Sequence, residues 1–232
     1  MQYAQPAKRT RRPGARVQFD VPTHVALGCG IGGEYIAAER AGFNTIAVWD
    51  KCPANKAVLD QVTDAHVVCD DISNAGHVAD IRKRTRGPVH LVTCSWSCKP
   101  NTSLNANASS TDHRLRDALL FVQRACELEP LMILCENVPG IFLPKRKEHL
   151  SAIRRIFNKH GYHVETATMD SNRLGSPMRR DRAYILASRI TTTALQETAA
   201  AVRLRPRMPI SHWWPNAKAN RCSPRAAACC WA

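Results

Sequence analysis

Residues 27–33 read Leu27-Gly28-Cys29-Gly30-Ile31-Gly32-Gly33, and this glycine-rich stretch decides the fold. An apolar run from Val25 leads into it, and a helical pattern from Glu34 to Ala41 follows. Glycine permits a sharp turn that brings backbone amides close to a ligand, and the first N–H groups of a helix have no partner within it. Strand, glycine turn and helix predict the first unit of a Rossmann-type sheet, with all seven residues as candidate cofactor contacts. A tight turn without a ligand is the alternative.

Further apolar runs alternate with helical patterns along the rest of the chain. We predict strands at Thr45–Trp49, His66–Cys69, Val89–Thr93, Leu131–Cys135, Tyr162–Met169 and Ala183–Ser188. The helical patterns between them cover Cys52–Val62, Ala75–Arg84, Arg114–Leu128 and Lys145–Lys159. This alternation indicates an α/β domain with a mostly parallel sheet and helices on both faces.

The charge of the chain points to an anionic partner. Its 232 residues carry a formal net charge of +14, which favours nucleic acid first and an anionic membrane second. No apolar run approaches the length of a membrane span, and the polar, basic N-terminus does not resemble a signal peptide. We therefore expect a protein without a membrane association.

The ten cysteines do not predict a disulfide scaffold or a metal site. Most lie within or beside apolar runs, where a free thiol behaves as a small hydrophobic group. No Cys-x-x-Cys pair occurs, so we expect no zinc. A reducing cytoplasmic or nucleoid-associated location fits this pattern better than secretion.

Polar residues stand where the predicted strands end, and ligands bind at that edge of an α/β sheet. Asp50 ends the second strand, where such folds hold ribose hydroxyls. Asp71-Ile72 follows the third strand as a candidate contact for a cofactor base, although Asp71 could instead cap a helix. Lys51 and Ser95 complete the predicted cofactor contacts.

Three segments divide the chain. Residues 1–20 are predicted to form a basic flexible arm, either solvated or seeking phosphates, and residues 21–190 the catalytic domain. Residues 191–232 contain Pro, Trp and Cys in a basic tail for which we expect little order.

A long polar loop, Ser95–Ser110, leaves the fourth strand at the expected ligand edge.

Chemically active groups occupy three predicted strand ends. Cys98 follows the fourth strand, Glu136-Asn137-Val138 follows the fifth, and Arg180 and Arg182 precede the last. With the glycine turn, these motifs resemble those of the cytosine-C5 DNA methyltransferases, in the same order and from about Val25 to Ser188. The family's Pro-Cys motif corresponds to Ser97-Cys98, its Glu-Asn-Val motif is intact, and its Gln-x-Arg-x-Arg motif corresponds to residues 178–182. The family's second-strand acid and its Asp-Ile pair fall on Asp50 and Asp71-Ile72.

The resemblance implies a Rossmann-like, S-adenosylmethionine-dependent methyltransferase fold and a reaction. Cys98 would add to C6 of cytosine, with Lys99 helping to favour the thiolate. Glu136 would stabilise N3 as the general acid. Arg182 suits the O2 edge of the base, and Arg180 a phosphate or a structural ion pair. The target base in DNA must flip out of the duplex, and the 95–110 loop would close behind it.

Several positions depart from the family pattern. Ser97 and Lys99 flank the nucleophile in place of proline and glutamine, and Gly28, His90 and Met178 replace phenylalanine, aspartate and glutamine. No counterpart of the family's target-recognition region follows Ser188. Four interpretations therefore stay open: an active DNA enzyme, a truncated or split-enzyme subunit that binds cofactor and nucleic acid without independent activity, an RNA methyltransferase, and a redox enzyme using Cys94 and Cys98. The second would take a complementing subunit that carries the target-recognition region.

Overall fold

The computed structural model describes residues 21–85, 87–102, 112–190, 193–207 and 209. The strands are β1 (Thr23–Leu27), β2 (Asn44–Trp49), β3 (His66–Val68), β4 (Leu91–Ser95), β5 (Met132–Asn137), β6 (His163–Asp170) and β7 (Asp181–Ser188). The α-helices are α1 (Gly33–Arg40), α2 (Pro53–Val62), α3 (Gly76–Arg84), α4 (His113–Glu127), α5 (Lys147–Lys159) and α6 (Ala194–Leu204). Short 3-10 turns η1 (Lys99–Asn101), η3 (Pro139–Phe142), η4 (Pro144–Arg146) and η5 (Ser171–Leu174) join them. The predicted arm, residues 1–20, lies outside the described residues.

One sheet of seven strands runs in the order β3-β2-β1-β4-β5-β7-β6. Strands β1 to β5 pair in parallel, and β7 pairs antiparallel with both β5 and β6. The predicted mostly parallel α/β fold is confirmed. Because β7 runs opposite to β5, the start of β7 lies at the same sheet edge as the end of β5.

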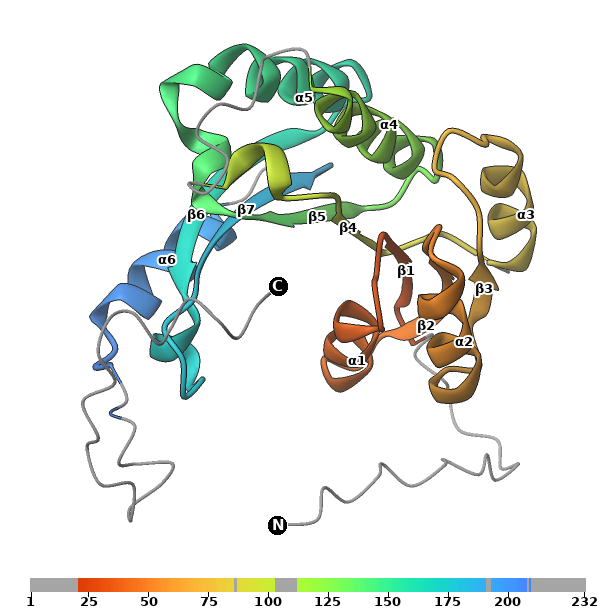
Figure 1. The fold of residues 1–232 in the computed structure, drawn as a ribbon, viewed down its shortest axis with the longest axis horizontal. Helices are drawn as coiled ribbons and strands as arrows, with labels where there is room; N and C mark the ends of the chain where they lie inside the picture. Colours follow the sequence, from red (N-terminus) through yellow and green to blue (C-terminus); the bar gives the residue numbers. More distant parts are fainter. Residues whose placement is uncertain (1–20, 86, 103–111, 191–192, 208, 210–232) are drawn as a thin grey trace.

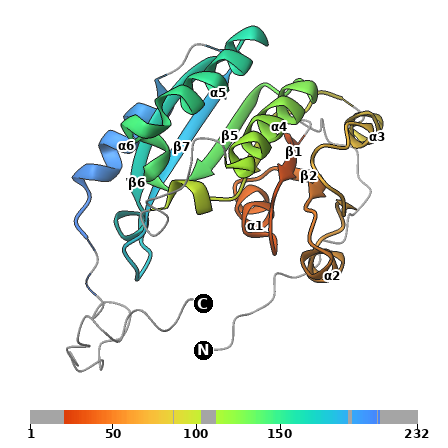
Figure 2. The ribbon, with the colours of Figure 1, turned by 45° about the horizontal axis from the view of Figure 1, so that its top comes forward.

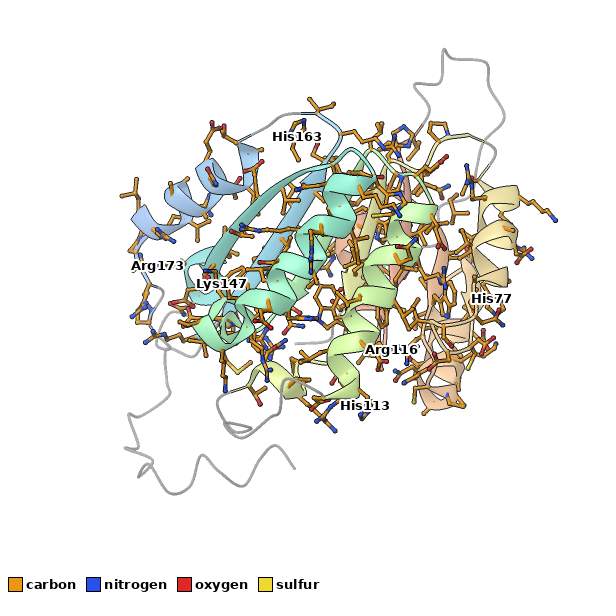
Figure 3. The ribbon with its side chains drawn as sticks, turned by 90° about the horizontal axis from the view of Figure 1, so that it is seen from above. His77, His113, Arg116, Lys147, His163 and Arg173 are labelled. Carbon is orange, nitrogen blue, oxygen red and sulfur yellow. The ribbon has the colours of Figure 1, made fainter. Side chains whose placement is uncertain are left out.

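Helices cover both faces of the sheet (Figure 1). On one face, α3, α4 and α5 pack on a large core that includes Val92, Ile133 and Phe157. Figure 3 looks onto this face and shows α4 and α5 side by side, with His113 and Arg116 at the start of α4. On the other face, α1 and α2 lie over a smaller cluster around Ala26 and Leu59. The sheet therefore has the two-sided cover that a parallel sheet needs.

The strands that carry the site extend further than the sequence predicted. β4 runs from Leu91 to Ser95, two residues beyond the predicted end at Thr93. β5 includes Glu136 and Asn137, which were predicted to follow the strand. The reason is pairing: Ser95 is opposite Glu136 in the β4–β5 ladder, and β7 pairs with β5 as far as Asn137. Ser95 and Glu136 therefore lie on regular strands, whereas Cys98 follows β4 at the start of η1.

The predicted domain boundary at residue 190 is wrong, because α6 belongs to the same domain. Leu195, Ala199 and Val202 of α6 are buried, and the helix packs against β6 (Figures 1 and 2). Glu165 of β6 accepts hydrogen bonds from the first backbone N–H groups of the helix. Beyond the helix, Arg207 forms an ion pair with Asp170. Residues 208 and 210–232 of the predicted tail lie outside the described residues.

No helix in the described ranges is both long and apolar enough to cross a membrane.

Candidate active site

The glycine turn after β1 has the left-handed backbone that glycine favours. The φ angles are 73° at Gly28, 55° at Gly30 and 98° at Gly32. A Cβ atom built on Gly30 or Gly33 would meet no atom within 4 Å, so both face open space. A Cβ on Gly28 would overlap the backbone carbonyl of Ser95. Gly28 therefore permits close packing of β4, whereas Gly30 and Gly33 leave room for a ligand.

The other residues of the turn serve different purposes. Leu27 and Cys29 are buried, and Ile31 is 67% exposed. Burial, with Asp50 and Glu34 nearby, raises the pKa of the Cys29 thiol to about 12. Cys29 is therefore a neutral packing group beside the turn.

Asp50 fixes the position of the glycine turn. Its carboxylate accepts hydrogen bonds from the backbone N–H of Gly30 at 2.9 Å and of Cys52 at 2.9 Å, and from Asn55 Nδ2 at 3.0 Å. The predicted acid at the end of β2 therefore lies directly beside the open turn. The bond to Gly30 connects the glycine turn at the end of β1 to Asp50 at the end of β2.

The predicted contacts after β3 lie next along this edge. Asp71 forms an ion pair with Lys51 at 3.5 Å and accepts a hydrogen bond from the backbone N–H of Ser73, which holds the pKa of Asp71 below its usual value. Ile72 is buried. Asp71 thus closes a local turn with Ser73. It does not cap a helix, the alternative role given from the sequence, because the N-cap of α3 is Ala75 and has no side-chain cap.

Cys98 is exposed at the start of the η1 turn. Asn137, at the end of β5, holds the backbone on both sides of it. The Asn137 amide donates to the carbonyl of Trp96 at 3.3 Å and accepts from Asn101 Nδ2 at 3.1 Å. Arg146 donates to the carbonyl of Pro100 at 2.6 Å. The segment that carries Cys98 is therefore fixed to the strand that carries Glu136.

Glu136 and Arg182 meet across two strands. Arg182 Nε lies 2.6 Å from Glu136 Oε1, and the two side chains are 19% and 35% exposed. The antiparallel register explains this contact, because Glu136 is opposite Tyr184 and Arg182 projects from the same face two residues earlier. Arg180 is exposed, and its backbone N–H bonds to Asp170. The structure thus separates the two predicted arginines into a partner of Glu136 and an outer cation.

The two cysteines near the end of β4 have different environments. Cys94 is completely buried, and burial beside Cys135 raises the pKa of its thiol well above the usual value. Cys98 is exposed. Cys94 therefore carries a buried neutral thiol, which does not suit the redox pair with Cys98 that the sequence left open.

Sequence analysis missed Glu34, in the first turn of α1. Its carboxyl accepts hydrogen bonds from Ser95 Oγ and, at 3.3 Å, from Thr93 Oγ1. Ser95, a predicted cofactor contact, therefore holds this partly buried acid. An acid in the first turn of a helix has an ordinary explanation, because it stabilises the positive end of the helix. Glu34 joins the candidate site only because β4 packs beside the glycine turn and brings Thr93 and Ser95 to its carboxyl group.

The residues around the turn fit S-adenosylmethionine. Gly30 and Gly33 leave room beside their backbone, the carboxyl groups of Asp50 and Glu34 lie beside the turn, and Asp71 pairs with Lys51, which follows Asp50. Backbone amides and carboxylates are suitable partners for ribose hydroxyls and for a cation.

The fold and these groups define a methyltransferase of the α/β class, and sequence comparison gives the family. Residues 23–209 match the sequence model of the C-5 cytosine-specific DNA methylases. This chain belongs to that family. The end of the matched region includes α6, in agreement with the corrected domain boundary.

Two curated relatives are type II methyltransferases. M.XorII of Xanthomonas oryzae pv. oryzae is 27% identical over 181 residues, which cover 72% of this chain and 41% of that protein. M2.BsuMI of Bacillus subtilis is 26% identical over 170 residues, which cover 71% of this chain and 41% of that protein. This chain therefore spans about 41% of the length of these relatives.

Solved structures share the fold. The methyltransferase EhMeth of Entamoeba histolytica has a TM-score of 0.59 at 19% identity, covering 74% of this chain and 54% of that one. The S. pombe Dnmt2 methyltransferase has a TM-score of 0.55 at 23% identity, covering 74% of this chain and 51% of that one.

Proposed function

We propose that this chain transfers a methyl group from S-adenosylmethionine to C5 of cytosine in DNA through a covalent bond between Cys98 and C6 of the base. The observation that carries this proposal is the placement of three groups at adjacent strand ends. Glu136 pairs with Arg182 at 2.6 Å, and Asn137 fixes the Cys98 segment to the same strand as Glu136. The glycine turn lies beside β4 at the same edge.

Cytosine C5 needs activation before it accepts a methyl group. The Cys98 thiolate adds to C6, and the electron pair of the C5–C6 double bond becomes available at C5. Glu136 stabilises the charge that develops at N3 by supplying a proton, and Arg182 donates to the O2 edge. The bound cofactor supplies an electrophilic methyl group. After the transfer, which leaves S-adenosylhomocysteine, the N3 proton returns to Glu136. A solvent base then takes the C5 proton as the Cys98 thiolate is eliminated, which restores the aromatic ring.

Access to the base requires that the nucleotide leaves the duplex stack. Arg180 and Arg179 are exposed beside Arg182, where they suit phosphates next to a flipped nucleotide. The predicted closing loop includes residues 103–111, which lie outside the described residues. The positive charge of the chain supports binding to phosphates but does not select DNA over RNA.

Trapping with a fluorinated base tests the covalent step. Mixed-sequence duplex DNA containing 5-fluorocytosine is incubated with the chain and S-adenosylmethionine, because fluorine at C5 blocks release of the enzyme. We expect a denaturant-resistant complex whose attached peptide contains Cys98. Cys98→Ser should abolish it, and Cys94→Ser should retain it. A complex that persists in Cys98→Ser would contradict the mechanism.

Extensions of the same trapping experiment test the other interpretations of the sequence. Fluorinated RNA of the same sequence tests the RNA alternative. Because the chain spans about 41% of its curated relatives, target recognition by a complementing subunit stays a prediction. Adding the region of M.XorII that this chain does not match, as a separate fragment, tests that prediction by an increase in trapped DNA.

A further inference from the structure

Glu34 is an acid that the proposed methyl transfer does not use, although it lies inside the predicted cofactor site. It follows Gly32-Gly33 directly, and its carboxyl reaches back from α1 to the end of β4. Both carboxyl oxygens accept hydrogen bonds there, one from Ser95 Oγ and one from Thr93 Oγ1. The side chain is therefore held beside the turn rather than in solvent.

A buried polar chain supports this orientation. Thr93 Oγ1 lies 3.0 Å from His24 Nε2, and His24 Nδ1 lies 3.0 Å from Thr45 Oγ1. When Thr93 donates to Glu34, a consistent assignment has His24 donate from Nε2 to Thr93 and accept from Thr45 at Nδ1. His24 is fully buried, and burial lowers its pKa to about 4, so it is neutral in this chain. The polar chain therefore holds Glu34 without giving it a cationic partner.

The titratable groups that face Glu34 are acidic or neutral. They are Glu136 on β5, Asp50 after β2, Cys29 on the turn and Cys94 on β4. Arg182, the cation on the same face of the sheet, pairs with Glu136. Burial, with smaller contributions from Glu136 and Asp50 and against the hydrogen bonds from Ser95 and Thr93, raises the pKa of Glu34 to about 7.

The position of Glu34 relative to Glu136 indicates which ligand group would meet it. Ser95 and Glu136 are register partners on neighbouring parallel strands, so their side chains project from the same face. A methyl donor must reach cytosine beside Glu136 and Cys98. The sulfonium of that donor is bonded to the methyl group, so a donor held by the glycine turn would bring this cation close to Glu34.

We propose that Glu34 is the counter-ion of the cofactor's sulfonium and releases its proton to solvent when S-adenosylmethionine binds. This inference rests on the proposed function, because it assumes that cofactor and that site. A nearby cation favours the ionised carboxyl, so binding and proton release are linked.

The linkage predicts a pH-dependent affinity. With a free-state pKa of about 7 and a much lower one in the complex, affinity for S-adenosylmethionine rises about tenfold from ~pH 6 to ~pH 8. At ~pH 6.5, binding releases about 0.8 proton per chain. S-adenosylhomocysteine lacks the sulfonium charge, so its binding should release almost no proton and change little with pH.

Titration calorimetry of the whole chain tests this in phosphate and in imidazole buffer, whose heats of ionisation differ. Glu34→Gln should lose the buffer-dependent heat, the pH dependence and much of the preference for S-adenosylmethionine. Glu148→Gln, an exposed acid in the first turn of α5 on the opposite face, should retain all three. The wild-type comparison of the two ligands needs no variant, so it stands even if Glu34→Gln fails to fold.

The outcomes are separable. Binding of S-adenosylmethionine without proton release, or with equal release for S-adenosylhomocysteine, overturns the role of Glu34 and leaves the proposed function standing. No measurable binding by the wild-type chain contradicts the cofactor assignment itself, and the role of Glu34 with it.

Discussion

Replacing Asn137 by alanine should destabilise the chain and disable the nucleophile, because one side chain holds the Cys98 segment on β5. Asn137 is 3% exposed. It donates to the Trp96 carbonyl at 3.3 Å and accepts from Asn101 Nδ2 at 3.1 Å and from the backbone N–H of Val138 at 3.0 Å. The variant leaves the Trp96 carbonyl and the Asn101 amide without these partners. Each such buried group costs about 1–3 kcal/mol, so the total is about 2–6 kcal/mol.

Thermal unfolding followed by circular dichroism measures this loss. For a domain of this size each kcal/mol lowers the midpoint by about 2–4 °C, so we expect a fall of about 5–20 °C. Asn158→Ala, at an exposed position of α5, is the matched control and should change the unfolding free energy by less than about 0.5 kcal/mol. Trapping on fluorinated DNA should also fall for Asn137→Ala at temperatures where it is folded. An unchanged midpoint together with full trapping would refute the positioning role.

Three further predictions follow from particular contacts. Gly28→Ala should lower the unfolding free energy by about 2–4 kcal/mol in urea, because the new Cβ overlaps the Ser95 carbonyl and φ is positive; a loss below about 0.5 kcal/mol would contradict that packing. Arg180→Gln should reduce the slope of log affinity against log salt for duplex DNA by about 0.9 in fluorescence anisotropy, and an unchanged slope would remove its phosphate contact. The pKa of His24, lowered to about 4, makes stability fall as pH drops below about 6.5, whereas the pKa of Glu34, raised to about 7, makes stability fall as pH rises above about 4.5. The two effects oppose each other between those pH values, so the unfolding free energy of Glu34→Gln should gain about 1.4 kcal/mol per pH unit more than that of the wild type, and parallel pH profiles would contradict the raised pKa of Glu34.

The strand ends were predictable from sequence because they depend on local patterns. Buried parallel strands are short apolar runs, and the first polar residues after them fall at one edge of the sheet. This placed Asp50 after β2 and Cys98 after β4, as in the structure, whereas Glu136 lies within β5 and not after it. The ends of β4 and β5 were predicted short, because Ser95 and Glu136 are polar yet continue the ladder through pairing with neighbouring strands.

Features that depend on distant pairing were not predictable from these patterns. The Arg182–Glu136 ion pair requires β7 to lie antiparallel beside β5, which no local pattern specifies. The helix α6 was missed because the apolar pattern fades among its alanines, and its burial comes from packing on β6. Glu34 was missed because its role comes from contact with β4 and not from its neighbours in the chain.

The insertion of β7 between β5 and β6 also bears on how the chain can be synthesised. Until Asp181–Ser188 has left the ribosome, β5 is an unpaired sheet edge, and β6 has no neighbour through which to join the sheet. Exposed edges of this kind favour pairing between nascent chains. The strand that closes this edge also carries Arg182, so the acid on β5 gains its partner only when the sheet itself is completed. A ribosome that stalls before Asp181 would therefore hold a chain prone to aggregation and without a complete site, and release of the last strand would remove both defects in one folding step.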